Sequence, residues 1–350
     1  MFSKLAKDID KALLDLSGQL KGSEGYRLLY KGIKDFMLRP GKRIRPVLFM
    51  TAYRGYTKKK RIPAGKLARS ALSVELLHDF LLVHDDVIDN SAVRRGKPSL
   101  HRFFNKELSR SAGDKIGSDL SIVAGDIIFA LAVDALMTVD ETPLRKQKAL
   151  EKFTEAARLT GIGEFIDVVN DTRSICSMKK EDILRAYELK TARYTFEAPL
   201  LIGAILAGAP ESERKKLSGL GVTLGQAFQI YDDLLDTFST SEKIGKPVLS
   251  DLAESKKTLM VWKTYNTLKG KDRRLLKELL EKDKKTRSDL LKFRRLITSS
   301  GSDRYCANKV LSLLLEAGTV CAGLKMRSGP KKTLRQFIRS FYSKTVTFSK

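Results

Sequence analysis

The chain has 350 residues, 42% of them hydrophobic and 31% charged, a composition typical of a soluble globular protein with a sizeable core. It has no long uninterrupted apolar run, no apolar signal segment at its start and three widely spaced cysteines. We therefore expect no membrane span, secretory signal or disulfide framework, but a cytoplasmic location and buried free thiols. The net charge of +25 favours anionic partners, although we interpret the basic runs mainly as solvated surface.

Apolar residues recur at intervals of three and four along most of the chain, which predicts helices. In chain order, the expected helices cover residues 5–20, 70–89, 118–137, 180–208 and 212–236, followed by a polar, surface helical hairpin over 269–303. Pro199 is expected to break the fourth of these, because proline lacks the amide hydrogen that a helix needs. Alternating strand patterns and Asn-Gly turns are absent. The sequence predicts an all-α fold with one core and a single domain over residues 1–350.

The motif D-D-x-x-D occurs twice, in HDDVID and in YDDLLD, each time within an apolar helical stretch. On a helix, Asp85 and Asp89 lie one turn apart on the same face, and so do Asp232 and Asp236. Like charges placed in this way repel one another, so they need a shared counterion. Carboxylate oxygens suit Mg²⁺, which is often held by one or two carboxylates and by substrate phosphates. Two such clusters facing across a cavity predict a diphosphate site bridged by Mg²⁺ rather than ordinary surface charge.

Basic residues accompany the first acidic motif. GKRIRP supplies Lys42, Arg43 and Arg45 directly before an apolar helix, and RRGKP supplies Arg94 and Arg95 shortly after Asp89. Arginine matches phosphate with a bidentate fork, and lysine adds a point charge. The pattern therefore indicates two anionic groups, one held through metal and the other held directly by cations.

Seven motifs follow one another along the chain: GKRIRP, LLHDFLLVHDDVIDNSAVRRGKPSLH, AGDIIFA, GEFIDV, ELKTA, GQAFQIYDDLLD and GKPVLSDLAESKKT. In this order they resemble the trans-isoprenyl diphosphate synthases, or polyprenyl synthetases, most closely the archaeal-type geranylgeranyl and farnesyl diphosphate synthases. The resemblance runs from about residue 35 to 260 and more loosely to the end. Two positions depart from the family pattern: Glu164 stands where glutamine is usual, and Ser255 stands where glycine is usual.

The resemblance implies a role for each matching residue. The isopentenyl diphosphate pocket would contain Lys42, Arg45, His78 and Arg95. The ligands of Mg²⁺, with three ions per active site, would be Asp85, Asp89 and Asp232, supported by Asp233 and Asp236. The cations that hold the allylic diphosphate would be Arg94, Lys190, Lys246 and Lys256. The groups that act beside the allylic carbon in catalysis would be Lys190, through its backbone carbonyl region, Thr191 and Gln229.

The resemblance also implies a helical bundle of the isoprenoid synthase type with a central active-site cavity, and a homodimer. The reaction would be Mg²⁺-assisted ionisation of a dimethylallyl, geranyl or farnesyl diphosphate, condensation with isopentenyl diphosphate, and loss of a proton. In this family, the fifth residue before the first aspartate motif limits the length of the product. Here that residue is Phe80, followed by Leu81, and the pair predicts mainly geranylgeranyl diphosphate.

Other functions fit the sequence less well. A farnesyl or longer-chain synthase differs only in product length. A non-catalytic regulatory subunit should lack part of an aspartate motif, whereas both are intact here. A basic nucleic-acid-binding protein would leave the aspartates unexplained, so no specific nucleic acid is expected, and a terpene cyclase would have little use for the isopentenyl pocket. Peripheral contact with an anionic membrane is a further use that the positive charge would allow.

Overall fold

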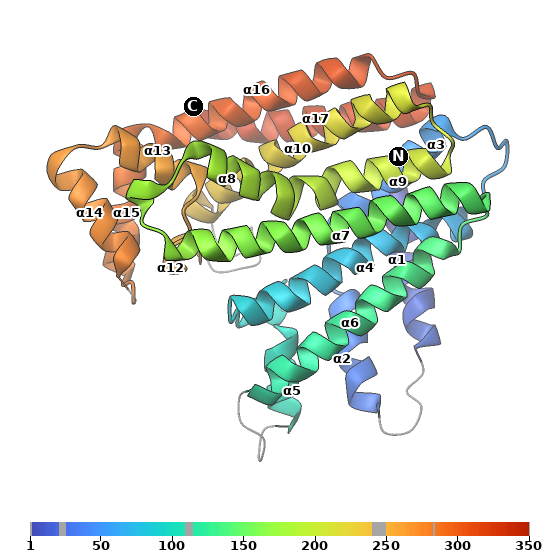
Figure 1. Cartoon of the computed structure of the whole chain (residues 1–350), viewed down its shortest axis with the longest axis horizontal. Coiled ribbons are helices and arrows are strands. Elements are labelled where there is room, and N and C mark those ends of the chain that lie inside the picture. The colour runs from blue at the N-terminus through green and yellow to red at the C-terminus, as the bar shows by residue number, and fades with distance from the viewer. Residues whose placement is uncertain (1, 21–25, 109–114, 240–249, 283, 350) are drawn as a thin grey trace. The chain divides into compact units, whose positions relative to one another are not determined.

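Helices make up nearly all of the regular structure in the computed structural model, which describes residues 2–20, 26–108, 115–239, 250–282 and 284–349 (Figure 1). The prediction of an all-α fold is confirmed. The chain forms two compact units. The first comprises residues 1–154, 199–214 and 326–333, and the second comprises residues 155–198, 215–325 and 334–350. The single domain expected over residues 1–350 stays a prediction.

The first unit is built around a long buried helix. Its elements are α1 (Phe2–Gln19), α2 (Arg27–Met37), α3 (Ile44–Tyr56), α4 (Ala64–Ile88), β1 (Val93–Arg94), β2 (Lys97–Pro98), α5 (Leu100–Leu108), α6 (Lys115–Met137), the start of α7 (Pro143–Thr172) and nearly all of α9 (Ala198–Leu206). In α1 the apolar residues that recur at intervals of three and four are all buried, as the periodicity predicts, namely Leu5, Ile9, Leu13 and Leu16. Helix α4 packs against α1, α3 and α6 and buries its middle on all sides.

Helix α6 is long and apolar enough to cross a membrane by length and composition. This is weak support for a span, because a core helix of a soluble protein passes the same test. Its apolar residues serve in part as packing surface: Gly125 lies so close to α4 that a Cβ there would overlap the ring of His84. The same ring lies 3.2 Å from the carbonyl of Ile122.

The segment after the first aspartate motif is a short hairpin, which the sequence did not predict. Val93 pairs with Pro98 and Arg94 with Lys97 in an antiparallel register. The two turn residues, Arg95 and Gly96, have φ angles of 54° and 75°. Two positive φ angles at the centre of a two-residue loop are typical of a type I′ turn. The sequence did not indicate this turn, because it lacks Asn-Gly and because arginine rarely adopts a positive φ angle.

The second unit contains the remaining helices. These are the later part of α7, a 3-10 turn (Ile175–Ser177), α8 (Lys180–Ala186), a π-helix (Tyr187–Glu197), most of α10 (Glu211–Phe238), α12 (Ser250–Ala253), α13 (Leu259–Thr267), α14 (Gly270–Glu281), α15 (Arg287–Ser300), α16 (Ser302–Ala322) and the later part of α17 (Ser328–Ser349). The expected polar hairpin is confirmed by α14 and α15, which also bury apolar side chains such as Leu276 and Phe293. Thr286 and Asp289 form a capping box that begins α15.

The expectation that Pro199 breaks the helix over residues 180–208 is wrong. The segment stays helical from α8 through the π-helix into α9, and Pro199 is the second residue of α9. A proline clashes with the carbonyl four residues before it, but a π-helix bonds over five residues and its wider turn relieves that contact. The cysteine expectation is also partly wrong: Cys306 and Cys321 are buried, whereas Cys176 is exposed.

Candidate functional site

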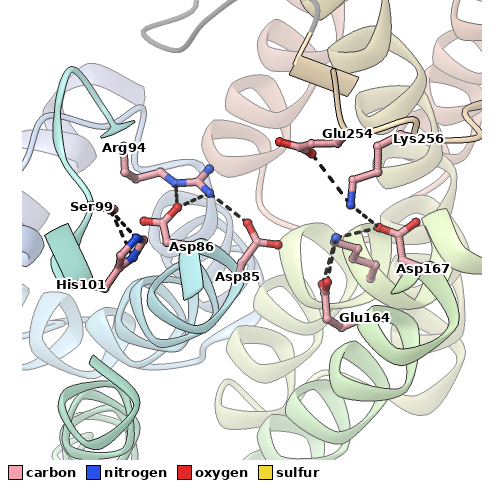
Figure 2. Close-up of polar contacts among 10 residues, drawn as sticks. Asp85, Asp86, Arg94, Ser99, His101, Glu164, Asp167, Glu254 and Lys256 are labelled. Atoms are coloured by element: carbon pink, nitrogen blue, oxygen red, sulfur yellow. Dashed lines mark hydrogen bonds and ion pairs between the residues drawn. The ribbon is translucent and has the colours of Figure 1, made fainter. Parts of the chain in front are cut away.

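The first aspartate motif lies at the C-terminal end of α4, where Arg94 of the hairpin joins it (Figure 2). The Arg94 guanidinium donates to Asp86 Oδ1 through Nε at 2.6 Å and to Asp85 Oδ2 through Nη2 at 3.0 Å. Asp86 is fully buried and its Oδ2 has no hydrogen-bond partner among the described residues, whereas Asp85 and Asp89 are partly exposed. Burial raises the pKa of Asp86 to about 6, against the opposing charge of Arg94. Asp85 and Asp89 are therefore the carboxylates of this motif that an external cation can reach.

Arg39 holds the hairpin in place. It is 2% exposed, donates to the carbonyls of Arg94 and Pro98 at 3.1 and 2.8 Å, and pairs with Asp35 at 2.9 Å. The sequence reasoning missed this residue, although it lies only two residues before GKRIRP. Because Arg39 fixes both strands through their backbones, it sets where Arg94 and Arg95 point.

The basic motif before α3 contains side chains of two kinds. Arg43 is buried and donates to Asp10 at 2.9 Å and to Glu75 at 2.8 Å, so it is a structural ion-pair residue. Lys42 is exposed and Arg45 is partly exposed, as expected for residues that meet a ligand.

His78 lies on α4 within the influence of the same cations. Burial, together with the positive charges of Arg45 and Arg95, keeps the pKa of His78 well below its usual range. The ring is therefore neutral near pH 7. It can act on a diphosphate only as a hydrogen-bond donor, not as a charge.

Two lysines of the second unit are bound to carboxylates (Figure 2). Lys190 lies on the π-helix and pairs with Glu164 at 2.9 Å and Asp167 at 2.8 Å, both on α7. Lys256 approaches Asp167 at 3.7 Å and Asp171 at 3.2 Å. These pairs bring the predicted residues Lys190 and Lys256 onto one acidic stripe of α7.

A chain of hydrogen bonds joins the other predicted residues of the second unit. Thr191 donates to Gln229 Oε1 at 2.7 Å, and Gln229 Nε2 donates to Asp233 Oδ1 at 2.9 Å. The hydroxyl of Tyr187 donates to Asp233 Oδ2 and accepts from the amide of Leu259. Burial raises the pKa of Asp233 to about 7. Both oxygens of this carboxylate are engaged inside the protein, and Tyr187 is a supporting residue that the motifs did not reveal.

The remaining acids of the second motif differ in exposure. Asp232 is partly exposed and Asp236 is 1% exposed. No group of three or more Asp, Glu, His or Cys residues forms a ready cation cage in the part of the chain that the structure describes. A cation held here by one or two carboxylates would complete its coordination with water and phosphate oxygens, as Mg²⁺ commonly does. The donor set thus fits that ion. Lys246 lies outside the described residues.

Phe80, the residue expected to limit product length, belongs to a row of aromatic rings in the first unit. Its ring centroid lies 4.6 Å from that of His84 and 5.2 Å from that of Phe129. The Phe129 ring lies 5.9 Å from that of Phe153, which is fully buried. Phe80 and Leu81 are themselves partly exposed. Phe80 therefore lies in a row of rings that leads from the partly exposed His84 through Phe129 to the buried Phe153.

Both departures from the family pattern have local partners. Glu164 gives Lys190 a carboxylate partner at 2.9 Å. Ser255 has a φ angle of 60°, a conformation that favours glycine, and its hydroxyl donates to the Leu280 carbonyl at 2.6 Å. Lys285 in turn donates to the same hydroxyl at 2.8 Å. These hydrogen bonds offset the cost of a side chain in the left-handed region.

Two glycines allow neighbouring helices to approach the π-helix. A Cβ at Gly163 of α7 would overlap the backbone of Lys190, and one at Gly225 of α10 would overlap the backbone of Ala192. No such contact exists at Gly219 of α10, where a Cβ would meet open space. The position of Lys190 and Thr191 thus depends on helices that are free of side chains at these two points.

Gly225→Ala is therefore expected to lower stability by about 1–3 kcal/mol, because overpacking forces the backbones apart. Activity should fall with it, since Gln229 lies one turn further along the same helix. Gly219→Ala is the matched control, and its better helix propensity should raise stability by up to about 1 kcal/mol. Denaturant unfolding of both variants measures the difference. Equal stability of the two variants would contradict the close approach.

The sequence and the fold of this chain are similar to those of known proteins. The polyprenyl synthetase family model matches residues 26–297. A short chain isoprenyl diphosphate synthase of Methanocaldococcus jannaschii is 33% identical over 258 residues, covering 73% of this chain and 72% of that protein. A geranylgeranyl diphosphate synthase of Methanosarcina mazei is 31% identical over 308 residues, covering 87% and 86%. The solved geranylgeranyl pyrophosphate synthase of Corynebacterium glutamicum, complexed with isoprenyl diphosphate and magnesium, has a TM-score of 0.90 at 22% identity and covers 98% of this chain and 99% of that one, which shows the shared fold.

Proposed function

Since the chain belongs to the polyprenyl synthetase family, we propose that its prenyltransferase activity joins isopentenyl diphosphate to allylic diphosphates and yields mainly geranylgeranyl diphosphate. The allylic substrates are dimethylallyl, geranyl and farnesyl diphosphates. The observation that carries the proposal is the doubled aspartate motif, intact at both places and accompanied by cations within each unit. Arg94 joins the first motif, and Lys190 and Lys256 belong to the unit that carries the second.

In the first unit, Lys42, Arg45 and Arg95 bind the diphosphate of isopentenyl diphosphate. Their side chains are exposed or partly exposed, unlike that of Arg43, which is buried and paired with Asp10 and Glu75. His78, being neutral, adds a hydrogen bond. A charge-assisted fork from arginine to phosphate is among the stronger polar contacts available to a protein.

The metal role falls to the reachable carboxylates, Asp85, Asp89 and Asp232, with Asp236 in support. Asp233, whose oxygens are engaged by Tyr187 and Gln229, acts by orienting the Gln229 amide. When bound, Mg²⁺, in three ions per active site, would neutralise charge on the departing diphosphate as a Lewis acid. Arg94 contributes positive charge at the same carboxylates.

In the second unit, Lys190 and Lys256 bind the allylic diphosphate by exchanging their carboxylate partners for phosphate oxygens, and Lys246 has the same role. The hydrogen bond from Thr191 to Gln229 leaves the threonine hydroxyl oxygen with lone pairs to offer to the developing allylic cation. Apolar side chains exclude water that would otherwise capture the cation. The proton released after condensation passes to the freed diphosphate.

Incubation of the full chain with Mg²⁺, labelled isopentenyl diphosphate and each allylic primer in turn tests the proposal. The expected result is elongation of all three primers, with geranylgeranyl diphosphate as the main product. Failure to elongate any primer would exclude the activity. Mainly farnesyl or longer products would keep the activity but overturn the length assignment.

The two substrate roles predict separate kinetic effects. Lys42→Ala and Arg95→Ala should raise the KM for isopentenyl diphosphate, while Lys190→Ala and Lys246→Ala should raise the KM for the allylic partner and lower kcat. A lost charged hydrogen bond costs roughly 1.5–3 kcal/mol, so each effect should be at least about tenfold. Lys66→Ala, at an exposed position of α4, is the control and should change neither constant. If all four site variants raised the same KM, the two-substrate map would be wrong.

We extend the proposal to the surroundings of the enzyme: a cytoplasmic homodimer that touches anionic membranes through α17. This helix contains no Asp or Glu, and Lys332, Arg335 and Arg339 lie exposed at spacings that place them on one face. Vesicle flotation tests the membrane contact. Binding to anionic but not neutral vesicles, lost in Arg335→Glu, supports the membrane contact, and equal recovery with both vesicle types would exclude it.

Light scattering tests the proposed homodimer, and a monomeric mass would exclude the dimer.

A further inference from the structure

A second row of carboxylates lies on α4, further back than the aspartate motif. Glu75 and Asp79 are four residues apart, so they share one face of the helix, and they are 2% and 0% exposed. Buried carboxylates are costly unless each has a cation or several hydrogen bonds. The proposed reaction uses neither of them directly, so each needs its own explanation.

Glu75 is fully explained by structure. It accepts from Arg43 Nη1 at 2.8 Å, and Arg43 also donates to Asp10 and to the carbonyl of Arg39. Arg43 has a φ angle of 48° immediately before α3, so its ion pairs hold a strained residue in place. The Arg43–Glu75 pair thus anchors the loop that presents Lys42.

Asp79 is not satisfied in this way. Its Oδ1 lies 3.5 Å from Arg95 Nη1, at the long limit of a hydrogen bond, and its buried Oδ2 has no hydrogen-bond partner among the described residues. A buried polar atom left in this state usually has a functional reason. The charged groups that act on Asp79 are Arg95 of the hairpin turn, Glu75 of α4, and Arg43 and Arg45 at the start of α3.

Arg95 shows the other side of the same contact. Among the described residues, the side chain of Arg95 has one hydrogen-bond partner, which is Asp79. Four of the five guanidinium N–H groups are therefore left for a ligand. Arg95 occupies the left-handed region in its turn, and within the described ranges Asp79 is the side chain that its guanidinium contacts through a hydrogen bond or ion pair. A single loose contact from one side would orient the group without neutralising it.

We propose that Asp79 is a positioning residue, which holds the Arg95 guanidinium toward the diphosphate of isopentenyl diphosphate from the side opposite the ligand. The inference rests on the proposed function, because it takes Arg95 to be a ligand of that diphosphate. Asp79 itself touches no reacting atom. Its effect should therefore appear in the binding of one substrate and leave the chemical step unchanged.

The charge state of Asp79 adds a pH dependence. Burial raises the pKa of Asp79 to about 7, although Arg95 and Arg43 oppose this. Below that pH the carboxyl is neutral and Arg95 offers its full charge to the ligand. Above that pH, the Asp79 carboxylate competes with the diphosphate for Arg95 and repels the diphosphate. The KM for isopentenyl diphosphate should therefore rise as the pH passes upward through about 7.

Two substitutions separate position from charge. Asp79→Asn keeps an oxygen that accepts from Arg95 but cannot ionise, whereas Asp79→Ala removes the acceptor. Asp79→Ala is expected to raise the KM for isopentenyl diphosphate about tenfold, with kcat and the allylic KM within about twofold of the parent chain. Asp79→Asn should keep the low-pH KM of the parent and lose its rise above neutral pH.

Steady-state kinetics of the full chain from pH 6 to 9, with thermal unfolding of each variant, decide between the outcomes. Changes in stability with an unchanged isopentenyl KM and pH profile would reduce Asp79 to a structural residue and overturn the inference. A KM raised equally by both variants would also overturn it, because charge rather than position would then matter. Arg95→Ala separates a failure of the proposed function from a failure of this inference. If the variant is active and its KM for isopentenyl diphosphate is unchanged, Arg95 is not a ligand of that diphosphate.

Discussion

Asp85→Ala and Asp232→Ala are each expected to lower turnover by several orders of magnitude. Each removes a carboxylate that an external cation can reach, and with it ligand charge at the bond that must ionise. The half-saturating concentration of Mg²⁺ should rise as well, because fewer protein ligands then hold the ion. Steady-state rates measured across a Mg²⁺ titration report both effects.

An exposed carboxylate supplies the control for this experiment. Asp134 lies exposed on α6 and belongs to neither aspartate motif, and Asp134→Asn should keep the rate and the Mg²⁺ dependence of the parent chain. Asp85 also accepts from Arg94, so Arg94→Ala is a useful companion variant. It should lower the rate without changing the Mg²⁺ requirement as strongly. Near-normal turnover of either aspartate variant at limiting Mg²⁺ would refute the metal assignment.

Phe80→Ala is expected to shift the product toward chains longer than geranylgeranyl diphosphate. We infer that the growing chain runs from the diphosphates back along α4, toward its N-terminus. At about 1.5 Å per residue, Phe80 lies roughly 7.5 Å deeper than Asp85. Its ring is followed in the row by Phe129 and Phe153, so its removal opens space only as far as the Phe129 ring. Chromatographic sizing of labelled products measures the shift.

Leu81→Ala is the matched control for Phe80→Ala. Helix geometry places residue 81, four positions back, directly beneath Asp85, whereas the family resemblance singles out residue 80. Both side chains are partly exposed, so neither truncation should cost the stability typical of a core cavity. A longer product from Leu81→Ala alone would move the floor to that residue. A destabilised Phe80→Ala enzyme with an unchanged product would make Phe80 ordinary core packing.

The helices were predictable because their apolar residues follow a simple period. The positions that the period marks in α1 are the buried ones, and the polar hairpin of α14 and α15 carries a recognisable Thr286–Asp289 cap. The β1–β2 hairpin was not predictable, because its turn places an arginine in a conformation that usually selects glycine or asparagine. The π-helix was equally hidden, since apolar spacing does not distinguish it from an α-helix.

The site was predictable at the level of residue types but not of individual partners. Spacing alone brings Asp85 and Asp89 to one face, and both keep the exposure that a ligand needs. Spacing could not indicate that Asp233 would turn inward to Tyr187, because that depends on which helix packs against α10. The buried pairing of Arg43 with Glu75 likewise joins residues that are 32 positions apart. Such contacts arise from tertiary packing, which local patterns do not contain.

The π-helix Tyr187–Glu197 makes this segment more sensitive to the loss of a residue than to its replacement. A π-turn differs from an α-turn by one extra residue, so deleting one residue allows the segment to close into an ordinary α-helix. The helix on either side would keep its orientation, because the wider turn absorbs the extra residue, whereas side chains within the π-helix would shift by one position, or about 100° around the axis. Lys190 and Thr191 would then leave the side on which Glu164 and Gln229 lie. A homologue with a one-residue gap here must assemble its lysine and threonine differently, even where every aligned letter agrees.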